Sequence, residues 1–174
     1  MDELVALVSL DATVTGSAPR SVVRRDNLLH AATAVLVRNS AGRIYVHRRS
    51  AHKDWAPSHH DAAAGGVMTY GEEPLAAAAR ELAEELGIRD AELRSLGLSV
   101  FEDDTTRCVE HVFEIVWDAA IDFVDDEVVW GTWLTLPELG ARLRDPDWLF
   151  VPDTRLLLES LVLRGIGDYA RLHD

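Results

Sequence analysis

Residues 66–88 constrain the fold of this chain more than any other segment, because a glycine-containing turn there leads into an amphipathic helix. Pro74 suits the first position of a helix, and Gly87 stands where a helix commonly ends. These signals predict a helix over residues 74–86. Its apolar residues are expected to form a stripe facing the core, made of Leu75, Ala78, Ala79, Leu82 and Leu86.

Three glutamates on this helix are the first candidates for chemistry. Glu81, Glu84 and Glu85 stand at i, i+3 and i+4, so we expect them on one face, opposite the apolar stripe. Carboxylates at this spacing repel one another by about 0.2–0.5 kcal/mol per pair. Arg80 offsets part of that repulsion, and a divalent cation would offset more. Because hard cations prefer oxygen ligands, the pattern predicts a Mg²⁺ site, with Mn²⁺ as an alternative and the main-chain carbonyl of Gly65 as a further ligand.

The rest of the chain reads as strands followed by helices. Apolar runs predict strands at 4–10, 31–37, 43–49, 92–101, 108–117 and 128–136. Helices are predicted at 137–143 and 153–163, and residues 50–60 are predicted to form a loop. This order implies an α/β (α+β) fold, in which helices cover the faces of a layered sheet.

Length and composition narrow the class of protein. A chain of 174 residues with 48% hydrophobic residues is expected to form one domain over 1–174, with 1–27 as an N-terminal strand and extension. A net charge of −13 disfavours a nucleic-acid polymer as partner. The single cysteine, Cys108, allows no internal disulfide. No signal peptide and no membrane span of ~18 apolar residues is evident, so we expect a cytoplasmic protein without a membrane partner.

Residues 66–88 fit the pattern G-x5-E-x7-R-E-U-x-E-E-x-G-U without a departure, with Leu82 and Ile88 at the aliphatic positions U. Its seven fixed residues, at ~7% each, coincide by chance about once in 10⁸ placements. This pattern is the Nudix box, so the chain resembles the Nudix superfamily. The resemblance implies a mixed β-sheet sandwiched between helices, and a Mg²⁺-dependent hydrolase of diphosphate linkages, usually of a nucleoside diphosphate joined to another group.

The same resemblance assigns roles to residues. The three box glutamates and the Gly65 carbonyl are the implied metal ligands, and Glu72 and Arg80 form the implied ion pair between loop and helix. The implied reaction is attack of water on one phosphorus of a P–O–P bridge in a small-molecule diphosphate. The general base is open between Glu81 and Glu85 in the box and Glu127 on an acidic segment before the last strand.

The flanks of the box are similar to the Nudix branch that includes isopentenyl-diphosphate isomerase and its hydrolase-like relatives. The matching segments are Leu29-His30-Ala31-Ala32, Arg48-Arg49, Lys53 and Pro57 before the box, and Asp125-Asp126-Glu127-Val128 and Trp133 after it. In the isomerases the residues that match Arg49 and Lys53 hold the substrate diphosphate. We therefore expect these two cations to bind substrate here, facing the carboxylates of the metal site.

Two alternative functions stay open. An isomerase is disfavoured, because its catalytic cysteine is matched by Ala64 and its catalytic glutamate, by ungapped alignment, by Cys108. A non-catalytic Nudix module that binds a nucleotide is disfavoured because such modules usually lose box carboxylates, and this chain has lost none. A single sequence shows no interface pattern, so a homodimer is also left open.

Overall fold

The computed structural model describes residues 2–174; Met1, at the start of the predicted extension 1–27, lies outside them. Strands in this range form one mixed sheet. They are β1 (Leu4–Val8), β2 (Val14–Pro19), β3 (His30–Arg38), β4 (Ile44–Arg49), β5 (His60–Asp61), β6 (Ala63–Ala64), β7 (Arg94–Glu102), β8 (Arg107–Val116) and β9 (Val128–Leu134). The helices are α1 (Arg20–Asp26), α2 (Pro74–Leu86), α3 (Leu136–Leu143) and α4 (Pro152–Leu163), followed by a short 3₁₀ helix, η1 (Tyr169–His173).

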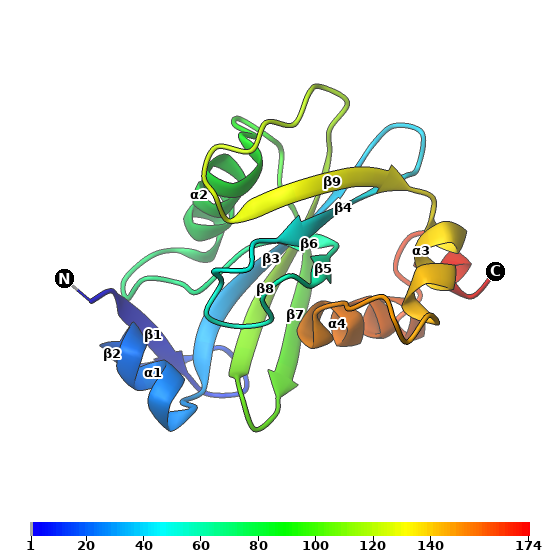
Figure 1. Cartoon of the computed structure of the whole chain (residues 1–174). Helices are drawn as coiled ribbons and strands as arrows, with labels where there is room; N and C mark the ends of the chain where they lie inside the picture. The colour runs from blue at the N-terminus through cyan, green and yellow to red at the C-terminus, as the bar shows by residue number, and fades with distance from the viewer. Residues whose placement is uncertain (1) are drawn as a thin grey trace.

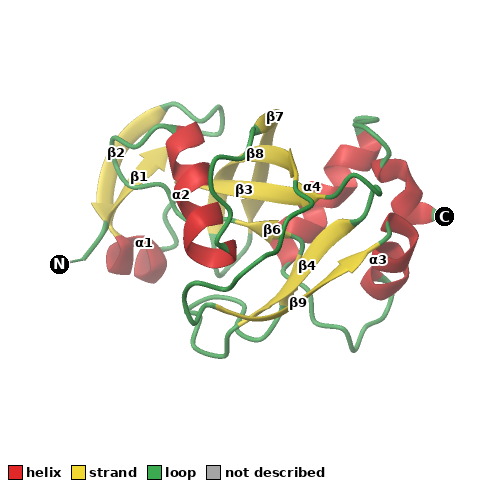
Figure 2. Cartoon of the chain, turned by 90° about the horizontal axis from the view of Figure 1, so that it is seen from above, coloured by secondary structure: helices red, strands yellow, loops and turns green. Residues whose placement is uncertain are grey.

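Helices cover both faces of the sheet, as the sequence predicts (Figures 1 and 2). Successive side chains of β3 point to opposite faces. Val35 and Val37 pack with the apolar residues of α2, whereas Ala34 and Leu36 pack with those of α3 and α4. The prediction of a mixed sheet sandwiched between helices is therefore confirmed.

The centre of the sheet is a parallel pair of distant strands. β3 pairs with β8 in register from His30 opposite Cys108 to Arg38 opposite Val116, and β7 adds an antiparallel edge. On the face shared with α4, the first halves of β3 and β8 carry Ala32, Cys108 and a buried glutamate, Glu110. The parallel register therefore places Cys108 and Glu110 of β8 beside the start of β3.

The sheet opens on the other side of β3. β3 and β4 form a hairpin, but they pair only at Arg38 and Ile44 near the turn. Farther along, β6 pairs with β3, while β5 and β9 pair with β4. Figure 2 shows β4 and β9 turning away from β3. This divergence makes room for a cavity between the two parts of the sheet.

Two elements were not predicted from the sequence, β2 and α1, which lie between β1 and β3. One expectation about local structure is wrong in part: of the predicted apolar stripe of α2, Leu75 is 54% exposed and Ala79 is exposed. Glu81 and Glu85 are buried beside Leu82 instead of lying opposite the stripe. The helix turns these carboxylates inward, toward the cavity.

Candidate active site

The three glutamates of the box differ strongly in exposure. Glu85 is 2% exposed and Glu81 is 9% exposed, whereas Glu84 lies mostly in solvent. Burial raises the pKa of Glu85 to about 8, and Lys53 opposes that shift. Burial also raises the pKa of Glu81, against the attraction of Arg80. The negative charge of Glu81 and Glu85 is thus energetically unfavourable in these buried positions unless a cation lies nearby.

Arg80 joins the loop before α2 to the glutamates of the helix. Its Nε lies 2.9 Å from Glu72 Oε1, and its Nη2 lies 3.0 Å from Glu72 Oε2, which makes a bidentate pair. Its Nη1 donates to Glu81 at 2.7 Å and to Glu84 at 3.1 Å. Glu72 also accepts a hydrogen bond from the backbone N–H of Thr69 at 3.2 Å. One guanidinium therefore orders both the loop and two of the three box carboxylates.

Two consecutive glycines let the backbone approach these carboxylates. A Cβ at Gly66 would lie 2.8 Å from Glu81 Oε1, closer than real Cβ contacts allow. A Cβ at Gly65 would lie only 1.9 Å from the backbone oxygen of Thr33. The N–H of Gly65 donates to Glu85 Oε2 at 3.2 Å. Both glycines are required by close approach and not by a left-handed φ.

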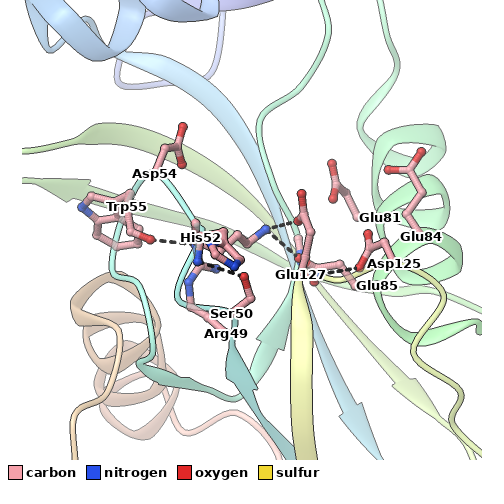
Figure 3. A network of polar contacts seen from close by, with 12 residues as sticks. Arg49, Ser50, His52, Asp54, Trp55, Glu81, Glu84, Glu85, Asp125 and Glu127 are labelled. Carbon is pink, nitrogen blue, oxygen red and sulfur yellow. Dashed lines mark hydrogen bonds and ion pairs between the residues drawn. The ribbon is translucent and has the colours of Figure 1, made fainter.

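Lys53 connects the box to the acidic loop before β9, whose Asp125 and Glu127 lie beside Glu85 in Figure 3. Its Nζ lies 3.3 Å from Glu85 Oε1 and also contacts Glu127 Oε2. The backbone N–H of Glu127 donates to Asp125 Oδ1 at 3.0 Å. The structure thus places Lys53 between Glu85 of the box and Glu127, two residues that the sequence predicted separately.

Arg49 faces the cavity but is largely engaged by its own loop. It donates to the backbone oxygens of Ala56 at 3.2 Å and Trp55 at 3.0 Å. Its Nη1 lies 3.8 Å from Asp61 Oδ2. Arg49 therefore also holds the shape of the loop that carries Lys53, a role that the sequence analysis did not assign to it.

The cavity between the two parts of the sheet has a volume of about 430 Å³. Glu81, Glu84, Arg49, Lys53 and Glu127 all line it. Several further charged groups on its wall were not predicted from the sequence. They include Arg20 and Arg24 of α1, Asp54 of the loop, Asp61 of β5, Glu110 of β8 and Asp153 of α4.

The donor set of the box fits a hard divalent cation. Glu81, Glu84 and Glu85 supply only oxygen atoms, and the Gly65 peptide lies against one of them. The ammonium of Lys53 already lies between Glu85 and Glu127, so the carboxylates gather around positive charge. Oxygen-rich sites of this kind suit Mg²⁺ or Mn²⁺.

Comparison with known proteins supplies the family. Residues 28–154 match the NUDIX domain. The chain is 42% identical to orf19 of Rhodococcus erythropolis, an uncharacterized Nudix hydrolase, over 90% of each chain. It is 35% identical to the uncharacterized Nudix hydrolase YfcD of Salmonella typhi, over 99% of this chain and 91% of that protein. The crystal structure of DR0079 from Deinococcus radiodurans matches with a TM-score of 0.76 at 28% identity, over 95% of this chain and 100% of that one.

The chain therefore belongs to the Nudix family, as its box predicts. It is a hydrolase that acts on phosphorus-containing acid anhydrides. The similarity of its flanks to the isomerase branch stays a prediction. No helix within residues 2–174 has the length and apolar character needed to cross a membrane.

Proposed function

We propose that this chain is a Mg²⁺-dependent hydrolase that cleaves the P–O–P bridge of a nucleoside diphosphate derivative by attack of water on phosphorus. One observation carries the proposal: Glu81 and Glu84 of a complete box line the same cavity as Arg49 and Lys53, and Lys53 contacts the buried Glu85. A bridging diphosphate needs metal cations on one side and hydrogen-bond donors on the other. The box carboxylates would hold the cation, and Arg49 and Lys53 would supply the donors.

Glu81, Glu84, Glu85 and the Gly65 carbonyl would hold the Mg²⁺ ion. When bound, Mg²⁺ neutralises charge on the bridge and makes a water molecule more acidic. Arg80 keeps Glu81 and Glu84 oriented through its hydrogen bonds.

Lys53 and Arg49 would hold the substrate phosphates. Lys53 supplies a mobile point charge, while the guanidinium of Arg49 supplies directed donors. Lys53 contacts both Glu85 and Glu127, so both carboxylates lie beside a group that would bind the substrate phosphates. We therefore assign the general base to one of these two residues, of which Glu127 is the more exposed to solvent.

A panel of diphosphates tests the proposal. The chain is incubated with Mg²⁺ and a nucleoside triphosphate, a nucleotide sugar, a dinucleotide, coenzyme A or a prenyl diphosphate, and released phosphate and monophosphate are measured. Excess EDTA should abolish turnover of every substrate that is cleaved. Undiminished turnover after exhaustive chelation would contradict the metal dependence.

Amide variants of the box test the residues. Glu85→Gln should lower kcat by about 10² or more, as expected when a charged group that acts in the transition state is removed. Glu127→Gln tests the second candidate base: a comparable loss of kcat assigns the base to Glu127, and a kcat near that of the wild type leaves Glu85 as the base. Glu92→Gln, an exposed carboxylate outside the cavity, is the matched control and should keep full activity. Full activity in Glu85→Gln would contradict its role in the site, whereas wild-type protein that hydrolyses no member of the panel would favour a non-catalytic nucleotide-binding module.

A further inference from the structure

A second group of metal-ligating side chains lies in the cavity, outside the Nudix box. Cys108 and Glu110 stand two residues apart on β8, so their side chains project from the same face of the strand. Asp153 reaches them from the first turn of α4. The Sγ atom and one carboxylate oxygen from each acid all lie within 4.8 Å of one another. The three ligands thus come from two elements that pack together in the core.

One carboxylate oxygen of Glu110 is buried and has no hydrogen-bond partner among the described residues. Glu110 is 4% exposed, and its Oε2 atom has no hydrogen-bond partner among residues 2–174. Leaving a buried acceptor unpaired is unfavourable, and native structures rarely do so. The nearby Asp61 is different, because Thr154 Oγ1 donates to it at 2.7 Å and the N–H of Ala63 donates at 3.0 Å. Glu110 is therefore the carboxylate that a ligand in the cavity would complete.

Arg24 and Arg49 oppose the effect of burial on the pKa of Cys108 and Asp153 but do not cancel it. Burial raises the pKa of both the Cys108 thiol and the Glu110 carboxyl. Burial raises the pKa of Asp153 to about 7, with the charge of Asp61 as a further cause. A cation that entered the group would displace protons from these atoms, as metal ions do when they bind thiols and carboxylates.

We propose that Cys108, Glu110 and Asp153 form a second cation site, one that takes a borderline-soft divalent ion such as Zn²⁺. A thiolate and two carboxylates are ligands that Zn²⁺ accepts, whereas Mg²⁺ requires oxygen throughout. All three residues line the cavity, so a fourth position stays open to water or to a substrate atom. The cavity would then select two ions by donor set, a hard ion at the box and a softer one at Cys108.

Cobalt titration of the full chain tests this site. Co²⁺ occupies zinc sites, and a thiolate ligand gives it a sulfur-to-cobalt charge-transfer absorption that oxygen ligands do not give. Reduced, metal-free protein is titrated with Co²⁺ in a large excess of Mg²⁺, which competes for the box. One equivalent of Co²⁺ should produce the charge-transfer band, and added Zn²⁺ should remove it.

Three variants and one control assign the ligands. Cys108→Ser should abolish the band. Glu110→Gln and Asp153→Asn should weaken Co²⁺ binding by about tenfold or more, since even the loss of an outer-shell partner typically costs 10–100-fold. Glu84→Gln is the matched control, because it makes the same carboxylate-to-amide change in the box, and it should leave the band unchanged.

The result that would overturn the site is the absence of the band at saturating Co²⁺ in wild-type protein that is folded by circular dichroism. A band that persists in Cys108→Ser, or that Glu84→Gln removes, would equally refute it. Should Cys108→Ser fail to fold, the nearly isosteric Glu110→Gln still decides the question. Binding is measured without turnover, so a failure to hydrolyse any diphosphate would contradict the proposed function and leave this site standing.

Discussion

Replacing Gly66 with alanine should damage the metal site while leaving the fold intact. The new Cβ would lie 2.8 Å from Glu81 Oε1 and 2.9 Å from its Cδ, whereas ordinary van der Waals contact begins at 3.4 Å. The backbone cannot retreat easily, because the Gly66 carbonyl accepts a hydrogen bond from the N–H of Thr33 at 2.9 Å. The carboxylate of Glu81 must therefore move by about 0.6 Å or more.

The two consequences differ greatly in size. A misplacement near 1 Å in a catalytic constellation can cost about 10²-fold in rate, so we expect kcat to fall by roughly that factor. Stability should change little. Gly66 has no left-handed φ, so alanine gains about 0.4–1 kcal/mol from a less flexible unfolded chain, which offsets about 0.5–1.5 kcal/mol for a displaced side chain.

Gly65→Ala is the matched control, because its Cβ would lie 1.9 Å from a backbone oxygen that cannot rotate away. This variant should lose stability strongly, whereas Gly66→Ala should melt close to the wild type. The assays are thermal unfolding, kcat on a substrate from the diphosphate panel, and Mn²⁺ affinity by electron paramagnetic resonance. Wild-type activity and Mn²⁺ affinity in Gly66→Ala would refute the close-approach argument, as would a melting temperature as low as that of Gly65→Ala.

Three further outcomes are expected. Arg49→Ala should raise KM more than it lowers kcat if the guanidinium grips a non-reacting phosphate, and an unchanged KM would end the similarity to the isomerase branch at this residue. Isopentenyl diphosphate with Mg²⁺ should give no allylic isomer by NMR, because Ala64 offers no proton; conversion above a control without enzyme would contradict this. Burial lowers the pKa of His47 to about 3, so below pH 6.5 the unfolded chain binds a proton that the folded chain does not, and the free energy of unfolding falls by roughly 3 kcal/mol by about pH 4.5. His47→Leu should lose this part of the pH dependence in urea unfolding, and parallel curves for both proteins would argue against it.

Local patterns predicted most of the elements because each pattern is complete within a few residues. Pro74 and Gly87 mark α2, and the alternation in residues 43–49 marks β4. The pairing of β3 with β8 has no such mark, since it joins residues 30–38 to residues 107–116. α1 was missed because its seven residues are too few to show a clear period.

The box could be found in the sequence because all of its ligands lie on one contiguous segment. Glu110 and Asp153 belong to different elements, and only the packing of α4 against the sheet brings them together. One signal was available: Glu110 is a charged residue inside an apolar run, at a position where charge is rarely buried without a partner. An acid in a strand indicates a polar environment, but it does not say which residues share it.

The error in the α2 stripe has the same physical origin as the site itself. A pattern that assumes apolar residues inside and charges outside sends Glu81 and Glu85 to the solvent. The fold buries both of them beside Leu82, where Arg80, Lys53 and the Gly65 N–H supply the polar partners that replace water. Burying a charged carboxylate is unfavourable even when it has polar partners, and a bound cation would offset that unfavourable free energy. Glu81 and Glu85 therefore depart from the amphipathic pattern of α2 at the positions that would bind the cation, and their burial lowers the stability of the fold in favour of the chemistry of the site.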